Sequence, residues 1–256
     1  KEGFMFESII KKFHQIRMNG YVESVNSNFN GIGLTFEKLL GKEPDDFSYP
    51  DYEGIEVKTS LIVSDFPTTL FSLHPWGNIM PASQYLRKKY GYFDYSPENE
   101  RKLNTEFYYS KNILINNRYY FNLERCDEEG KLYLKVYDYK NTLLDKNVYW
   151  YYTDIKEALE NKLKYLAFIL ASAKNIGNKK YYYYRRLYCF TLKGFDIFLD
   201  LLEKNIISIA IGTTTLSDDS GNDKYNMHVH FRIDKHNISK LFDLVYYEGD
   251  DKNRFL

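Results

Sequence analysis

Four strand-like segments follow one another in the middle of the chain and limit the folds open to it. They read EFYYS, RYYFNLER, KLYLKVYDY and NVYWYY, between about residues 107 and 152. The DEEG between the second and third segments is typical of a hairpin turn. We therefore expect an antiparallel β-meander in this region.

Helices and strands are mixed on both sides of the meander. Apolar residues recur at helical spacing in ESIIKKFHQIRMNG, LTFEKLLG, PASQYLRKKYGY, TDIKEALENKLK, LKGFDIFLDLLEKN and NISKLFDLVYY. Strands are predicted for GIEVKTSLIV, TTLFSL, YLAFILAS, KKYYYYRRLYCF, IISIAIG and MHVHFRI, with the polar loop TTTLSDDSGNDKYN before the last of them. The mixture favours an α/β core that carries a β-rich insertion.

The charge and cysteine content of the chain limit which partners it can bind and indicate its cellular compartment. The chain has 35 basic and 35 acidic residues, so a nucleic-acid partner requires positive charge concentrated on one face. Its two distant cysteines, Cys126 and Cys189, match neither a disulfide scaffold nor a zinc site, which indicates a reducing cytoplasm. No secretory segment is visible near the start, and the longest apolar run, 165–173, is too short to span a bilayer.

The stretch YPDYEGIEVKTS gathers charged residues in an otherwise strand-like segment. Glu56 and Lys58 share a strand face, and Asp51 precedes them across a turn that Gly54 allows to bend. Converging carboxylates favour a hard cation such as Mg²⁺, and a nearby lysine can orient a water or stabilise a charged phosphoryl transition state. The pattern therefore indicates phosphodiester hydrolysis. A solvated face of an edge strand is the alternative.

The chain resembles the MvaI/BcnI restriction endonucleases, which are relatives of the mismatch-repair nicking enzyme MutH. The resemblance begins with NGIGLTFEKLLG, PDYEGIEVKTS and TTLFSL, and continues through KKYGYFD, NVYWYY and HVHFRI. These blocks occur in the family's order over most of the chain. The resemblance implies a PD-(D/E)xK endonuclease core, with a mixed sheet flanked by helices, and a β-rich DNA-recognition lobe.

The resemblance also implies roles for individual residues. Asp51 and Glu56 would hold Mg²⁺ with help from the Val57 carbonyl, and Lys58 would position the attacking water. Glu37, on the preceding helix, would be an outer ligand or a water-orienting group. The alternative for Glu37 is a surface glutamate that pairs with a lysine.

The implied lobes are discontinuous parts of a single compact chain. The catalytic lobe is expected to centre on about residues 1–110 and 155–192. The recognition lobe is expected to be built from parts of about residues 110–152 and 193–256.

The segment DSGNDKYNMHVHFRID is the best candidate for reading DNA bases. His228, His230 and Arg232 alternate on one strand face, and Asn226 precedes them. Arginine is the natural bidentate partner of guanine, and Asn or His can bond to base edges. The family pattern H-G-T-x-F-R-I is one residue longer than HVHFRI, so the target sequence stays open. A zinc site on the two histidines is an alternative, although no third ligand is spaced to join them.

Basic and aromatic residues interleave in NKKYYYYRRLY. Lys179 and Arg185 fall on one side of the expected strand and could follow DNA phosphates. A core strand with charged ends is an equally good interpretation. The basic residues at 87–89, on the helix before Tyr90, are a further candidate for phosphate contacts. A solvated helix face explains them at least as well.

The leading hypothesis is a Mg²⁺-dependent type II restriction endonuclease that acts on double-stranded DNA. The resemblance implies a short G/C-rich site of the CC-x-GG kind, a monomer that nicks the two strands in turn, and a cognate DNA methyltransferase in the same cell. A MutH-like strand-specific nickase and a DNA-binding module with a vestigial nuclease site are the alternatives. No membrane partner is expected.

Overall fold

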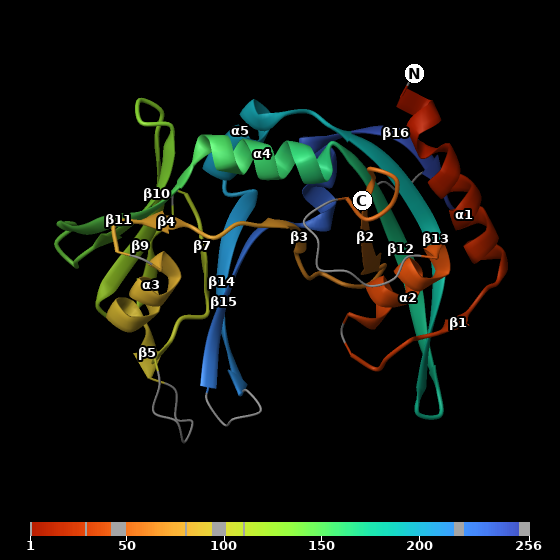
Figure 1. The fold of residues 1–256 in the computed structure, drawn as a ribbon, viewed down its shortest axis with the longest axis horizontal. Coiled ribbons are helices and arrows are strands. Elements are labelled where there is room, and N and C mark those ends of the chain that lie inside the picture. The colour runs from red at the N-terminus through yellow and green to blue at the C-terminus, as the bar shows by residue number, and fades with distance from the viewer. Residues whose placement is uncertain are drawn as a thin grey trace. The chain divides into compact units, whose positions relative to one another are not determined.

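The computed structural model describes residues 2–28, 30–41, 50–79, 81–93, 101–109, 111–217 and 223–250 of the chain (Figure 1). The chain divides into two compact units, each built from segments that are distant in sequence. Unit 1 contains Lys1–Thr68, Leu159–Gly194 and Asp234–Leu256, and unit 2 contains Thr69–Ala158 and Phe195–Ile233.

Unit 1 is organised around a mixed sheet with the strand order β1-β13-β12-β2, in which β16 also pairs with β13. β2 runs parallel to β12, whereas β12 and β13 form a long antiparallel hairpin. The apolar run 166–171 of β12 is buried, as expected for a strand that is covered on both faces. The strands are β1 (Val22–Glu23), β2 (Glu56–Leu61), β12 (Tyr165–Ile176), β13 (Lys179–Leu192) and β16 (Phe242–Glu248).

Two helices cover one face of this sheet, α1 (Glu7–Met18) on β13 and α2 (Gly31–Leu40) on β2 (Figure 1). α1 follows the short 3₁₀ helix Glu2–Phe6 and buries Ile9, Phe13 and Ile16, which recur at helical spacing. Full burial of each such side chain stabilises the fold by about 1.5–3 kcal/mol. This core holds β2 in place.

Unit 2 contains a five-stranded sheet, a four-stranded sheet and a two-stranded ribbon. The five-stranded sheet has the order β4-β11-β10-β9-β8, and its antiparallel β9, β10 and β11 confirm the expected meander. The four-stranded sheet has the order β3-β15-β14-β7, and β5 pairs with β6. The strands are β3 (Thr68–Ser72), β4 (Trp76–Gly77), β5 (Tyr92–Phe93), β6 (Arg101–Lys102), β7 (Thr105–Phe107), β8 (Ile113–Ile115), β9 (Tyr119–Cys126), β10 (Lys131–Tyr137), β11 (Leu143–Tyr151), β14 (Ile207–Ser217) and β15 (Asp223–Ile233).

An aromatic cluster forms the core of unit 2 on one face of the four-stranded sheet. Phe231 of β15 stacks on Phe71 of β3 with ring centroids 4.6 Å apart, and the Trp150 ring meets Phe231 edge-on. Phe198 of α5 (Phe195–Glu203) contacts both phenylalanines. The opposite face of the sheet is therefore left for polar residues.

The other helices are α3 (Ala82–Tyr90), α4 (Tyr152–Leu163) and α6 (Ile238–Leu241), which follows the 3₁₀ turn Lys235–Asn237. α4 begins in unit 2 and ends in unit 1, because the division falls within it. Among the described residues, no helix has the length and apolarity that a bilayer crossing requires.

The helix expected over NISKLFDLVYY is mostly wrong. Only Ile238–Leu241 is helical, and the chain then enters β16, which pairs with β13 from Phe242 to Glu248. The apolar residues of this segment fit both periodicities, and the open edge of β13 decides in favour of the strand.

The polar loop expected over residues 213–226 is also corrected. β14 extends to Ser217 and β15 begins at Asp223, so most of the segment is a β-hairpin whose backbone pairs in register. The two compact units divide the chain at other residues than the expected lobes, whose catalytic and recognition roles stay a prediction. Residues 69–109 lie in unit 2, because β3 and β7 belong to the sheet of β14 and β15. Residues from 234 onwards lie in unit 1, because β16 pairs with β13.

Candidate active site and recognition surface

A tight turn folds Asp51 back onto the start of β2. Tyr52 and Ile55 exchange backbone hydrogen bonds of 2.9 and 2.8 Å across the turn, and its central residues Glu53 and Gly54 have φ of 49° and 82°. Two left-handed residues in succession favour glycine at the second position. Asp51 Oδ2 then accepts a hydrogen bond of 3.0 Å from the Val57 amide. The turn therefore fixes a carboxylate beside the first residues of the strand.

Glu56 is a buried carboxylate that faces two lysines. The residue is 1% exposed, and its Oε1 lies 2.5 Å from Lys58 Nζ and 3.5 Å from Lys162 Nζ. Burial raises the pKa of Glu56, the two lysines oppose this rise, and the Asp51 carboxylate adds to it. The charge of Asp51 is thus close enough to act on Glu56. The structure brings Asp51, Glu56, Val57 and Lys58 together, as their spacing predicted.

The second carboxylate oxygen of Glu56 fits a cation. Oε2 is buried and has no hydrogen-bond partner among the described residues, which is costly for a carboxylate oxygen unless something else binds it. Within the described ranges, no three His, Cys, Asp or Glu side chains lie close enough to hold a metal ion. Two carboxylates and a backbone carbonyl nevertheless suit Mg²⁺, which keeps waters and takes phosphate oxygens as further ligands.

Glu37 approaches β2 from helix α2 at a different point. A Cβ on Gly33 would lie 3.8 Å from Glu37 Oε1 and 3.6 Å from Thr59 Oγ1. Thr59 alternates with Lys58 along the strand, so this contact concerns the face of β2 opposite to Glu56 and Lys58. A role of Glu37 as an outer ligand stays a prediction.

Lys162 was not foreseen from the sequence. It lies in the last turn of α4, directly before β12, and Leu166 of β12 pairs with Glu56 of β2. Only the parallel pairing of these two strands brings Lys162 to the carboxylate. Without that topology, the residue looks like any basic side chain at the C-terminal end of a helix, where it complements the helix dipole.

In unit 2, the polar face of the four-stranded sheet carries the predicted base-reading residues. His228, His230 and Arg232 pair across the ladder with Gly212, Ala210 and Ser208 of β14. Residues paired in this way point to the same face of a sheet. Val229 and Phe231 between them are buried in the aromatic core. The three predicted side chains therefore lie next to small residues of the neighbouring strand β14.

Two further residues join the histidines on this face, and the sequence alone did not single them out. Ser72 Oγ lies 2.8 Å from His230 Nδ1, and the rings of His230 and His228 stack 5.8 Å apart. Burial lowers the pKa of His74, and the nearby His228 contributes to the same effect. In the part of the chain that is described, these histidines form no three-ligand metal cluster. The side chain of Asn226 lies outside the described residues.

Lys179 and Arg185 of β13 each bind an acid within unit 1. Lys179 Nζ lies 2.9 Å from Glu23, and Arg185 Nε lies 2.7 Å from an oxygen of Asp250. The tyrosines at 182 and 184 are buried in the core, and a bulge displaces Arg185 from the regular alternation. This strand resembles a core strand with charged ends more than a phosphate track.

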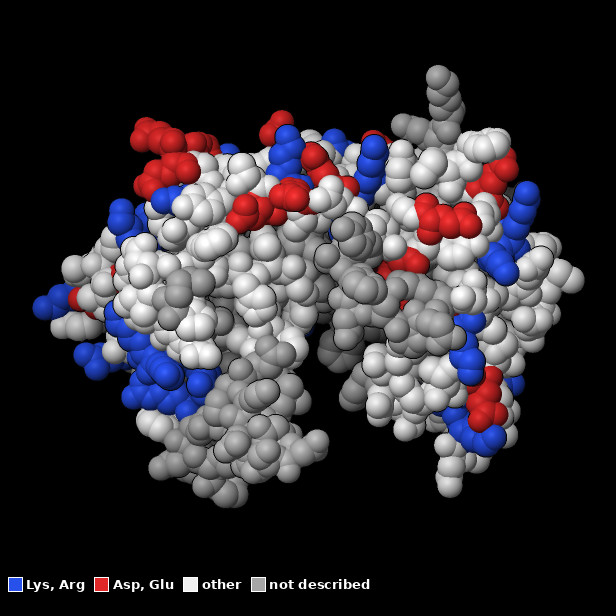
Figure 2. Space-filling view, in the orientation of Figure 1, with Lys and Arg blue, Asp and Glu red and all other residues white. Residues whose placement is uncertain are grey.

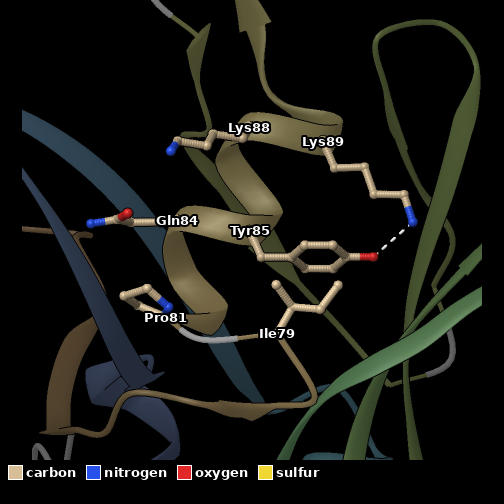
Figure 3. Close-up of a pocket in the computed structure, with 6 residues that line it drawn as sticks. All are labelled: Ile79, Pro81, Gln84, Tyr85, Lys88 and Lys89. Atoms are coloured by element: carbon tan, nitrogen blue, oxygen red, sulfur yellow. Dashed lines mark hydrogen bonds between the residues drawn. The ribbon is translucent and has the colours of Figure 1, made fainter.

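Basic side chains also gather beside α3, as Figure 2 shows. Arg87 is buried and donates a hydrogen bond to the Arg101 carbonyl, whereas Lys89 binds the buried carboxylate of Asp145 at 2.9 Å. A cavity of about 370 Å³ lies along the helix, and Figure 3 shows the side chains of Lys88 and Lys89 pointing in opposite directions. The residues that line the cavity are Ile79, Pro81, Gln84, Tyr85, Lys88 and Lys89. Of the three basic residues at 87–89, the exposed Lys88 fits the expected solvated helix face best.

Comparison with known proteins finds a family model and solved structures that match this chain. The profile of the MvaI/BcnI restriction endonuclease family matches residues 10–242. The solved complex of restriction endonuclease MvaI with its cognate DNA substrate superimposes with a TM-score of 0.83 and 27% identity, covering 93% of this chain and 96% of MvaI. MvaI in the absence of DNA gives a TM-score of 0.61 at 27% identity, covering 94% and 96%. No curated protein matches the chain.

The fold therefore defines a restriction endonuclease, a class of DNA nucleases. Within that class, the chain belongs to the MvaI/BcnI restriction endonuclease family.

Proposed function

We propose that the protein is a type II restriction endonuclease that uses Mg²⁺ to hydrolyse phosphodiester bonds of double-stranded DNA. The observation that carries this proposal is the buried Glu56 carboxylate, with one oxygen facing Lys58 and the other without a hydrogen-bond partner among the described residues. Asp51 and Glu56, with the Val57 carbonyl, are the residues that would hold the ion. A bound Mg²⁺ supplies charge stabilisation at the phosphate and a more acidic water.

The protein groups have distinct tasks in this scheme. Lys58 orients the attacking water and faces the charge that develops on the phosphoryl oxygens. The water oxygen bonds to phosphorus and gives up a proton to solvent. The bond from phosphorus to the 3′ oxygen breaks, and that oxygen takes up a proton from solvent. The products are a 5′-phosphate and a 3′-hydroxyl.

The proposed target is a short G/C-rich duplex site of the CC-x-GG kind. Its readers are Arg232, His228 and His230 on the polar sheet face, with Asn226 on the same strand. Arginine and histidine offer the donors that guanine O6 and N7 accept. We further propose that the enzyme acts as a monomer and that a cognate DNA methyltransferase protects the host's own sites.

Digestion of a plasmid of known sequence tests the proposal. Purified protein with Mg²⁺ is expected to give discrete fragments whose mapped ends share one short site, and EDTA is expected to stop cleavage. Fragments without a common end sequence would contradict site-specific cutting.

Two alternatives are distinguished in the same assay. A MutH-like nickase would relax the plasmid without making it linear. A DNA-binding module with a vestigial site would bind DNA and cut nothing. Loss of cleavage in Lys58→Ala, with DNA binding retained, excludes the module.

A further inference from the structure

A row of side chains crosses the polar face of the four-stranded sheet in unit 2. Ala210 of β14 pairs with His230 of β15 on one side and with Glu106 of β7 on the other. Ser72 of β3 extends the row through its contact with the His230 ring. The row therefore runs through all four strands and ends in a carboxylate, at Glu106.

The spacing of this row matches the dimensions of a DNA groove. Neighbouring strands lie about 4.8 Å apart, so the backbones at Glu106 and His230 are separated by about 10 Å. The major groove of B-DNA is about 12 Å wide. Ala210 and Gly212 of β14 have small side chains or none, so the sheet surface beside His230 and Glu106 leaves space for base edges.

Glu106 is held in a defined orientation. The Ser208 hydroxyl, which is buried, donates a hydrogen bond to Glu106 Oε1. Ser208 pairs in turn with Arg232, whose Nε is buried without a hydrogen-bond partner among the described residues. The carboxylate of Glu106 and the guanidinium group of Arg232 thus lie on the same face of the sheet. Ser208 lies between them, because it bonds to Glu106 and pairs with Arg232.

We propose that Glu106 is a specificity-determining residue that accepts a hydrogen bond from the N4 amino group of a cytosine in the recognised duplex. This inference rests on the proposed function and deepens it. Cytosine offers a donor in the major groove, and guanine offers two acceptors, so an acidic and a basic group together complement a G·C pair. Glu106 and Arg232 provide that combination, whereas the histidines alone do not. The negative charge also disfavours bases that present only acceptors at that position.

The inference is tested by removing the 4-amino group of cytosine from the DNA and the carboxylate of Glu106 from the protein, separately and together. The mapped recognition duplex is prepared with each cytosine replaced, one at a time, by the 2-pyrimidinone nucleoside, which lacks the 4-amino group. For wild-type protein, kcat/KM is expected to fall about 10-fold at the cytosine that Glu106 reads. Glu106→Ala is expected to cleave the natural duplex about 10-fold more slowly and to show no further loss with the analogue.

Two matched variants separate reading from folding. Glu124→Ala removes a carboxylate from the other large sheet of unit 2, where Glu124 binds Lys135, and is expected to keep the wild-type penalty for the analogue. Ser208→Ala leaves the Glu106 carboxylate in place and is expected to keep part of that penalty. Melting temperatures of all variants report on folding.

The outcomes are distinct. If Glu106→Ala is folded and still loses about 10-fold with the analogue, Glu106 does not read that amino group. If no cytosine position costs the wild type any activity, the inference is also wrong, although the proposed function stands. If the wild type cuts no DNA, the proposed function falls and the inference falls with it.

Discussion

At the scale of single residues, the carboxylate of Glu56 is a buried charge that needs compensation. Removal of a charge from water costs several kcal/mol unless partners compensate. Lys58 and Lys162 compensate at one oxygen, and the other oxygen faces no protein donor among the described residues. This asymmetry is what a cation ligand requires, and a purely structural ion pair does not explain it.

Lys162 is expected to support Glu56 while Lys58 acts on the water. In Lys162→Met, which keeps most of the side-chain volume, we expect single-turnover cleavage to slow by at least about 10-fold, because Lys58 must then balance Glu56 alone. The free energy of unfolding should fall by about 1 kcal/mol, since the ammonium group is partly exposed. Lys164→Met, on the neighbouring exposed lysine, is the control. Equal cleavage rates in the two variants would show that Lys162 has no part in the reaction.

Arg232 is expected to govern sequence preference. Arg232→Ala should cost about 1–3 kcal/mol of discrimination between the mapped site and single-base variants, because a bidentate contact to guanine is lost. Cleavage of a panel of variant duplexes measures this. Arg118→Ala, which removes an arginine stacked on Tyr119 in a turn of the same unit, is the control. An unchanged preference in Arg232→Ala would remove this residue from base reading.

At the scale of elements, the segment that follows β2 is fixed by a buried lysine. Lys235 is 4% exposed, and its Nζ donates to the carbonyls of Leu61, Ile62 and Ser64. Burial lowers the pKa of Lys235. The end of the strand that carries Glu56 and Lys58 therefore depends on a residue at 235, far away in the sequence.

Replacement of this lysine is expected to destabilise the fold. Lys235→Met should lower the free energy of unfolding by about 2–4 kcal/mol, because buried carbonyls lose a charged donor. Urea unfolding measures the change, and Lys240→Met on the exposed face of α6 is the control. A loss as small as that of the control would mean that water replaces the ammonium group at no cost.

The elements also show what local sequence can and cannot predict. The turn at Gly54, the strand of Glu56 and Lys58, the meander and the alternation of His228, His230 and Arg232 all follow from local patterns, and the structure contains each of them. The strand β16 does not, because its pairing with β13 overrides a helical pattern. Lys162, His74 and Glu106 reach their surfaces only through strand pairing or packing between distant segments, which no local pattern encodes.

At the scale of the whole molecule, the balance of 35 basic and 35 acidic residues means that net charge does not draw the protein to DNA. Binding must come from local groups, and its salt dependence reports how many phosphates they neutralise. Several basic side chains, such as Lys179 and Arg185, are already engaged with acids.

The proposed single catalytic set has a kinetic consequence. If the enzyme acts as a monomer, the two DNA strands are cut in separate events, and nicked plasmid should accumulate before linear plasmid appears. A time course on agarose gels at low enzyme concentration measures this. Conversion of supercoiled plasmid directly to linear product, with a rate that rises with the square of enzyme concentration, would instead indicate a dimer.

The most direct test of the active site compares wild-type protein with Glu56→Ala on one mapped duplex, with binding and single-turnover cleavage measured in parallel. We predict that the variant binds the duplex within about threefold of wild type and that its Mg²⁺-dependent cleavage falls by at least about 1,000-fold, because it lacks a ligand for the ion. Cleavage by Glu56→Ala at the wild-type rate would contradict the account.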